Sequence, residues 1–203
     1  MSLTGLLHER IIWERRLAVL TREIGKLLPA SGHILDVGAG RGTLAERLGA
    51  AHPGLRFSGV DVLVQPDARI PVIAYDGRTL PFERDAFSAV LLCDVVHHAE
   101  DQLQLLREAH RVAPVLIIKD HLAEGVFARR RLAFMDHVGN DRFGIEVRAK
   151  YWRRREWTEH FAATGWRADF WNESLGLYPF PLNLPFEGSL HFIARLHRAR
   201  GER

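Results

Sequence analysis

Cysteine is almost missing from this sequence, because Cys93 is the single cysteine among 203 residues. One cysteine excludes an internal disulfide framework and any zinc site built from several cysteines. Long apolar runs are missing too, and no stretch approaches the roughly 20 apolar residues that a membrane-spanning helix requires. Residues 1–16 mix acids and arginines with apolar residues, and so lack the continuous hydrophobic centre of a secretory signal. We therefore expect a cytoplasmic protein without a membrane span.

Lysine is also scarce, so the small net charge of +3 and the high pI come from arginine. Two clusters of consecutive arginines stand out, at residues 129–131 and 153–155. Both lie in stretches with a helical pattern, where neighbouring arginines point in different directions and mostly form a solvated face. No recognised nucleic-acid-binding motif accompanies the clusters, so we do not expect a nucleic-acid partner.

The chain shows no internal repeat and no low-complexity tract, and its length suits one substantial hydrophobic core. We predict a single domain over residues 1–203, with a leading helix within residues 1–30 and an insertion at residues 121–150. Apolar side chains recur at alternating steps of four and three along the leading segment, at Trp13, Leu17, Leu20, Ile24 and Leu27. This spacing predicts one helix with an apolar face.

The most informative stretch is residues 32–49, where a short apolar run is followed by three alternating glycines and an amphipathic helical pattern. The run predicts a buried parallel strand that turns directly into a helix. Glycines allow positive φ angles and let a ligand approach the backbone, while the first N–H groups of the helix face the turn. Thr43 and Glu46 have the spacing of a capping box, which would help to start this helix.

The glycine spacing separates two classes of cofactor. A dinucleotide-binding turn needs G-x-G-x-x-G, whereas Gly38, Gly40 and Gly42 give G-x-G-x-G, so we exclude an NAD-linked oxidoreductase. The stretch D-V-G-A-G-R-G instead resembles the first motif of the class I S-adenosylmethionine-dependent methyltransferases. In that family an acid precedes a turn that passes under the methionine and ribose of the cofactor. The resemblance implies that the cofactor-binding residues here include Asp36, Gly38, Ala39, Gly40 and Gly42.

The next two predicted strands each end in an acid. Asp61 follows the second strand, at a position where a carboxylate can accept hydrogen bonds from both ribose hydroxyls. The resemblance gives Asp61 this role and places Val62 beside the adenine. Asp76 and Gly77 open the pattern D-G-x-x-L-P-F, which is similar to a second signature of the family, and Asp76 is suited to accept from the adenine amino group. Ser88 departs from the family, which usually has Asp there.

Cys93 ends the fourth predicted strand and precedes D-V-V-H-H. In related methyltransferases the backbone at this point contacts the methionine amino group, so the resemblance adds Cys93 and His98 to the cofactor site. His97 and His98 with Asp94 are an alternative as metal ligands. Adjacent ligands on one loop rarely converge on one ion, so we expect no metal.

Three histidines are candidates for a general base that deprotonates the methyl acceptor, with His121 preferred and His98 and His137 as alternatives. His121 follows the fifth predicted strand, directly after Asp120, and a histidine oriented by a carboxylate could take a proton there. His137 lies in the insertion, near Asn140 and Asp141. The insertion also has Phe127, Leu132, Phe134 and Met135 available for burial.

Together these patterns predict a three-layer, Rossmann-like α/β fold with a seven-stranded, mostly parallel sheet and a C-terminal antiparallel hairpin. The resemblance implies an S-adenosylmethionine-dependent methyltransferase. We expect it to methylate an oxygen, nitrogen or carbon of a small, apolar or amphipathic molecule, as a monomer or homodimer. The alternative is a non-catalytic protein of this fold that binds RNA or a protein partner through its arginine clusters.

Overall fold

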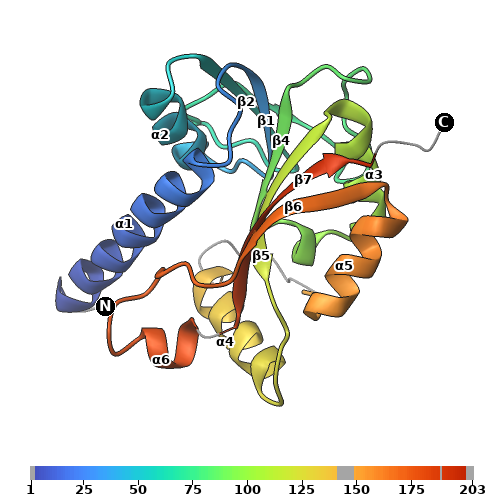
Figure 1. Cartoon of the computed structure of the whole chain (residues 1–203). Coiled ribbons are helices and arrows are strands. Elements are labelled where there is room, and N and C mark those ends of the chain that lie inside the picture. The colour runs from blue at the N-terminus through green and yellow to red at the C-terminus, as the bar shows by residue number, and fades with distance from the viewer. Residues whose placement is uncertain (1–2, 141–148, 188, 200–203) are drawn as a thin grey trace.

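The structure, a computed structural model, describes residues 3–140, 149–187 and 189–199. Its centre is a seven-stranded sheet with the order β3-β2-β1-β4-β5-β7-β6 (Figure 1). The strands are β1 (Gly32–Val37), β2 (Leu55–Asp61), β3 (Val72–Ala74), β4 (Ala89–Cys93), β5 (Val115–His121), β6 (Trp166–Asn172) and β7 (His191–Arg198). The first five run parallel, and β7 is antiparallel to β5 and β6. The predicted fold class, including the C-terminal antiparallel pair, is confirmed.

Helices cover both faces of the sheet. They are α1 (Leu3–Gly25), α2 (Thr43–Ala51), α3 (Gln102–Val112), α4 (Ala128–Asn140), α5 (Arg154–Ala163) and α6 (Asn183–Phe186), with a 3₁₀ helix, η1 (Val96–His98). In Figure 1, α1 and α2 lie on one side of the sheet and α3 and α5 on the other. The central strands are therefore buried on both faces, which explains their nearly continuous apolar sequences.

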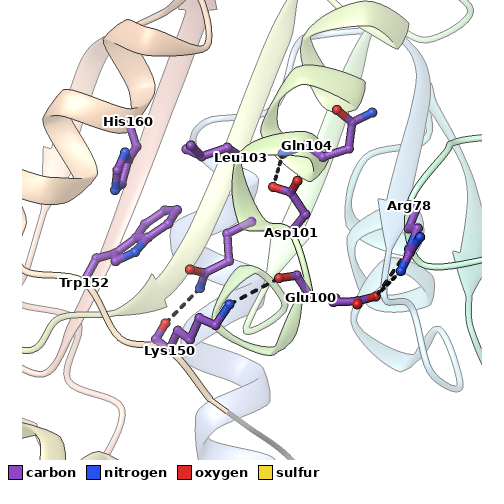
Figure 2. A pocket seen from close by; sticks show the side chains of 9 residues that line it. Arg78, Glu100, Asp101, Leu103, Gln104, Lys150, Trp152 and His160 are labelled. Carbon is purple, nitrogen blue, oxygen red and sulfur yellow. Dashed lines mark hydrogen bonds and ion pairs between the residues drawn. The ribbon is translucent and has the colours of Figure 1, made fainter.

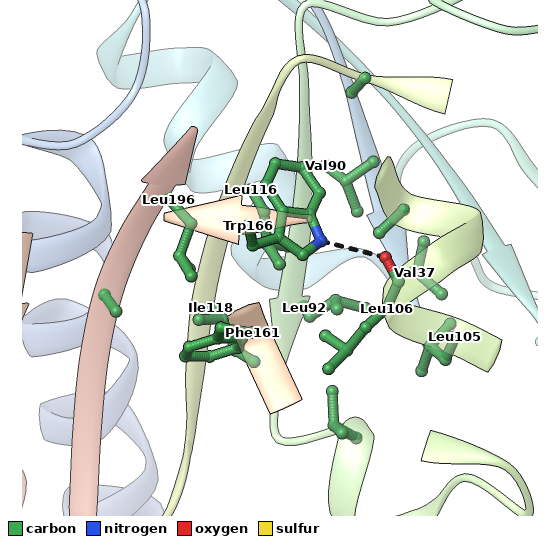
Figure 3. Packing of buried hydrophobic residues seen from close by; sticks show 14 of the residues in the cluster. Val37, Val90, Leu92, Leu105, Leu106, Leu116, Ile118, Phe161, Trp166 and Leu196 are labelled. Atoms are coloured by element: carbon green, nitrogen blue, oxygen red, sulfur yellow. Dashed lines mark hydrogen bonds between the residues drawn. The ribbon is translucent and has the colours of Figure 1, made fainter. Parts of the chain in front are cut away.

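Alternate residues of one strand pack into different layers. Leu35 points into a cluster that contains α3 and α5 residues, whereas its neighbour Ile34 packs with α1 and α2. Figure 3 shows the first cluster, in which the Trp166 indole donates a hydrogen bond to the Leu106 carbonyl at 3.0 Å. Trp157 and Phe161 lie four residues apart on one face of α5, and both side chains are buried in this layer.

Two predictions about helices α1 and α2 are wrong. Trp13 was expected on the apolar face of α1 but is 59% exposed, because the N-terminal half of α1 extends away from the sheet (Figure 1). The capping box is absent: Gly42, at φ 70°, is the N-cap residue of α2 and Thr43 is already helical. Glu46 instead forms an ion pair with Arg69 at 2.9 Å.

The insertion packs differently from the prediction. Leu132 is buried, but Phe127 and Phe134 are exposed, because one face of α4 points away from the sheet. Asp141 lies outside the described residues, as do the side chains of His137 and Asn140. None of the described helices combines the length and the apolar character that a membrane crossing requires.

Candidate functional site

The parallel strands β1 to β5 end at one edge of the sheet, and the chain order reverses between β1 and β4. Open α/β sheets bind ligands at such a reversal, beyond the carboxyl ends of the strands. The residues singled out from the sequence therefore gather at this edge. They form three groups: the glycine turn with its acids, a charged group around Asp94, and a histidine group around Asp120.

The glycine turn combines tight packing with one open position. All three glycines have positive φ angles, 72° at Gly38, 54° at Gly40 and 70° at Gly42. A Cβ at Gly38 would lie 2.6 Å from a Val95 methyl carbon, and one at Gly42 would lie 2.5 Å from Ile70. A Cβ at Gly40 would meet nothing within 4 Å. The backbone at Gly40 therefore borders open space, where a ligand can approach closely.

Asp61 ties the turn to the end of β2. Its carboxylate accepts hydrogen bonds from the backbone N–H of Gly40 at 2.8 Å and of Leu63 at 3.0 Å. Val62 follows with 63% of its surface exposed, and a Cβ at Gly77 would lie 3.3 Å from it. The structure therefore places Asp61, Val62 and Gly77 side by side, next to the open side of the glycine turn.

Two further acids differ in environment. Asp36 is buried at the end of β1, and burial, together with the charge of Asp61, raises its pKa to about 7. Asp76 is exposed and accepts from the backbone N–H groups of Thr79 and Arg78, which lower its pKa. Asp36 is thus poised to ionise near neutral pH, whereas Asp76 carries a full charge.

The second group surrounds Asp94, which adopts a left-handed conformation with φ 57° directly after β4. The fully buried Lys119 donates to one Asp94 oxygen, and Arg16 of α1 lies 3.5 Å from the other. Burial alone would raise the Asp94 pKa, but Lys119, His121 and Arg16 hold it well below its usual range. Arg16 also donates to the Tyr178 hydroxyl, so it links α1 to the segment before α6 next to the Asp94 carboxylate.

Lys119 has a second partner, His191 of β7, whose Nδ1 lies 3.3 Å from the ammonium. The other ring nitrogen of His191 lies 2.9 Å from the Phe186 carbonyl oxygen, so Nε2 carries the proton and Nδ1 accepts from Lys119. Burial and the nearby cation Lys119 hold the His191 pKa well below its usual range, which agrees with a neutral ring.

The third group contains His97 of η1 with Asp120 and His121 at the end of β5, all three buried. Asp120 accepts from His97 Nδ1 at 2.5 Å, whereas His121 Nδ1 is 3.6 Å away from the same oxygen. Asp120 therefore pairs more closely with His97, and the predicted contact between Asp120 and the His121 ring is present at the longer distance. The rings of both histidines point toward this oxygen, and their Nδ1 atoms lie 3.4 Å apart.

The pKa values of Asp120 and His121 are both lower than usual. Burial would raise the Asp120 pKa, but His97 and His121 hold it well below its usual range. Burial and then Lys119 lower the His121 pKa, so His121 is neutral at pH 7.

A separate groove of about 630 Å³ opens beside the N-terminus of α3 (Figure 2). Its lining includes Trp152 and His160, whose rings lie 4.2 Å apart, and the Arg78–Glu100 ion pair. The backbone N–H of Lys150 at its edge donates to the His97 carbonyl at 2.9 Å. The segment that borders the groove thus also covers the histidine group.

Comparisons with known proteins identify this arrangement. Residues 35–114 match the family described as "Methyltransferase domain". The matched residues run from β1 to the end of α3, and the match supports a class I S-adenosylmethionine-dependent methyltransferase domain. The match also supports methyltransferase activity with S-adenosylmethionine as the cofactor. No curated protein sequence matches the chain.

Solved structures agree with this fold at low sequence identity. A chain from the complex of the Haloferax volcanii methyltransferase activator Trm112 with a protein assigned as a methyltransferase has a TM-score of 0.72 and 17% identity, over 92% of each chain. A protein of Bacillus halodurans assigned as a methyltransferase has a TM-score of 0.64 and 17% identity, over 91% of this chain and 99% of that one. CalO1, a methyltransferase of calicheamicin biosynthesis in its S-adenosylhomocysteine-bound form, has a TM-score of 0.63 and 22% identity, over 95% and 55%.

The remaining candidates, Cys93 and His98, lie at the end of β4 and in η1. Cys93 is partly exposed at the end of β4, and burial raises its pKa well above the usual range. The His98 ring packs against His97 with 3.8 Å between ring centroids.

Sequence reasoning missed Arg16 and Lys119, and it considered His97 only as a metal ligand. A lysine inside the apolar run of β5 was a usable signal, because a lysine there must find a buried acid.

Proposed function

We propose that this methyltransferase acts on a small, apolar or amphipathic molecule and methylates an oxygen, nitrogen or carbon atom. The observation that carries the proposal is the burial of the charged and histidine groups at the ends of β4 and β5. Lys119, Asp120 and His121 are all buried, and Asp94 is only 25% exposed. A macromolecular acceptor would need a reacting surface open to the outside, whereas a small molecule can be enclosed.

The proposed cofactor contacts follow the order of the strands. The turn from Gly38 to Gly42, with Ala39 and Gly40, would lie under the cofactor, and the open space at Gly40 supports this fit. Asp61 would accept from the ribose hydroxyls in this arrangement. Val62, Asp76 and Gly77 would surround the adenine, and the exposure of Val62 suits a flat apolar partner.

The methionine end would then lie at the end of β4, near Cys93 and His98. An α-amino acid carries one positive and one negative group, and the site offers the complementary pair of Asp94 and Arg16. Asp36, buried under the same turn, would ionise more readily beside a bound cation, since an opposite charge offsets the cost of burial.

In the reaction the cofactor supplies an activated methyl group on a sulfonium. The protein aligns the acceptor atom with the methyl carbon and the sulfur, and excludes water. Once bound, the cofactor would supply the methyl carbon to the acceptor atom and would leave as a neutral thioether. For a hydroxyl or amine acceptor the proton must leave. Of the three proposed bases, His121 has the best support, because it is neutral and lies 3.7 Å from Asp94.

Calorimetric titration with S-adenosylmethionine and S-adenosylhomocysteine is the first test. We expect micromolar binding of both ligands and none of NADH. Radiolabelled cofactor would then be used to screen small hydroxyl, amine and carbon acceptors. Methyl transfer to a tRNA or protein fraction, with none to small molecules, would contradict the proposed acceptor class.

The alternative, an RNA- or protein-binding role of the arginine clusters, has less support in the structure. Arg154 and Arg155 form ion pairs with Glu173 and Glu159, and Arg131 donates to the Pro185 carbonyl at 3.3 Å. These arginines are partly engaged within the chain. RNA affinity that falls steeply with salt would nevertheless favour the alternative.

Partners and location are also open to experiment. The Haloferax volcanii chain is in a complex with a methyltransferase activator, so affinity purification should test for a protein partner here. Light scattering would distinguish the predicted monomer or homodimer. The cytoplasmic location predicted from the sequence stays a prediction.

A further inference from the structure

Three metal-ligand side chains converge at the end of β5. The possible ligand atoms of His97, Asp120 and His121 all lie within 4.8 Å of one another, and all three residues are buried. The sequence made this grouping hard to see, because His97 comes from the loop after β4 and the other two come from β5. The earlier doubt concerned His97 and His98 on one loop, whereas here His97 is joined by two residues from the end of β5.

The distances suit a small divalent ion. Zinc lies about 2.0–2.1 Å from histidine nitrogens, which places two ligands of a tetrahedral site about 3.3 Å apart. His121 Nδ1 lies 3.4 Å from His97 Nδ1 and 3.6 Å from Asp120 Oδ1. The third pair, His97 Nδ1 and Asp120 Oδ1, is 2.5 Å apart and shares a proton. Replacing that proton with an ion requires this pair to separate by roughly 0.8 Å.

Neighbouring groups already hold the ligands in place. Asp120 accepts from the backbone N–H groups of Val96 at 3.0 Å and His121 at 2.7 Å, which fixes its carboxylate. The Trp157 indole donates to the His121 carbonyl at 3.0 Å and fixes the end of β5. Such outer contacts orient the ligands of metal sites. Two imidazoles and one carboxylate favour first-row transition metals over magnesium or calcium.

We propose that His97, Asp120 and His121 bind one divalent transition-metal ion, and that the ion takes the hydroxyl oxygen of the methyl acceptor as a further ligand. The second half of this inference rests on the proposed function. The charges around the site support an anionic ligand. Asp94 and Asp120 are balanced by Lys119 and Arg16, so a bound divalent ion leaves a net positive charge. A hydroxyl that ionises on the metal reduces this excess, and its proton passes to solvent, because His121 as a metal ligand no longer acts as the base.

The test uses Co²⁺ alone, because its visible absorption reports its ligands. Protein stripped with a chelator would be titrated with CoCl₂, and separately with ZnCl₂ by calorimetry. We expect one equivalent to bind with micromolar or tighter affinity, and zinc to displace cobalt. His97→Asn and His121→Asn should each weaken binding at least tenfold. His197→Asn, on the exposed part of β7, is the matched control and should bind normally.

Two results would overturn the metal site: no stoichiometric binding by the folded wild-type protein, or equal affinity in wild type and both ligand variants. Circular dichroism would confirm that each variant is folded. Calorimetry with S-adenosylhomocysteine on the stripped protein separates this inference from the methyltransferase function. Cofactor binding without metal binding would contradict the proposed metal site but not the methyltransferase function. Metal binding without methylation of any hydroxyl compound would contradict the proposed hydroxyl acceptor but not the metal site.

Discussion

At the scale of single residues, Asp36 makes the stability depend on pH. Its pKa of about 7 in the folded protein is above the ordinary value of 3.8, so the folded state binds more protons between these values. The free energy of unfolding therefore falls as pH rises from about 4 to 7, by up to roughly 4 kcal/mol. Asp36→Asn should remove this part of the pH dependence.

Urea denaturation at pH 5 and pH 8 measures the effect. Wild type should lose more stability between the two pH values than Asp36→Asn does. Asp67→Asn is a suitable control, because Asp67 is exposed and pairs with Arg41 at the surface. Equal losses in wild type and Asp36→Asn would show that the carboxyl is ionised throughout.

Asp61 carries a second prediction at this scale. Substitution with Ala removes the acceptor for the Gly40 N–H and, in our proposal, for two ribose hydroxyls. Hydrogen bonds to a charged group contribute about 1.5–3 kcal/mol each, so the loss of two should lower cofactor affinity at least roughly 150-fold. Calorimetric titration with S-adenosylhomocysteine gives the dissociation constant. An unchanged value in Asp61→Ala would remove the ribose assignment, and Asp67→Ala should match wild type.

At the scale of elements, substitutions at two glycines of the turn should affect protein stability and cofactor binding differently. Gly40→Ala meets open space, and its strain at φ 54° costs about 1–2 kcal/mol. Gly42→Ala has similar strain at φ 70° and also collides with Ile70. We expect Gly42→Ala to have the lower melting temperature. Gly40→Ala should remain folded but lose most cofactor affinity, because its methyl group occupies the ligand side of the turn.

Thermal melting and calorimetry on the same two variants decide this. Normal cofactor binding by Gly40→Ala would mean that the open space at this glycine is not the cofactor site. Equal melting temperatures would mean that Ile70 moves aside without cost.

The elements also show what sequence can predict. Apolar runs such as that of β5, together with the glycine turn, indicate where the strands lie along the chain and which edge of the sheet binds a ligand, because burial on two faces and left-handed turns restrict the residue types. Side-chain pairing is different. The Asp120 carboxylate lies nearer to the His97 ring than to the ring of the adjacent His121, and that difference depends on how the loop after β4 folds over β5. Trp13 fits the helix period, but the period does not tell where the sheet beneath ends.

At the scale of the whole molecule, the two apolar layers share the same strands. Ile24 of α1 is fully buried against one face, and Leu106 of α3 is fully buried against the other. Because β1, β4 and β5 contribute residues to both layers, loss of one layer exposes the strands that support the other. The predicted single domain should therefore unfold in one transition, leading helix included.

Ile24→Ala and Leu106→Ala test this cooperativity. Each leaves a cavity in one layer and should cost about 2–5 kcal/mol, which lowers the melting temperature by roughly 5–15 °C for a chain of this size. Far-UV circular dichroism and tryptophan fluorescence should give coincident transitions in wild type and in both variants. If Ile24→Ala instead melts in two steps, with helix lost before the tryptophan signal changes, α1 folds separately and the single-domain prediction is wrong.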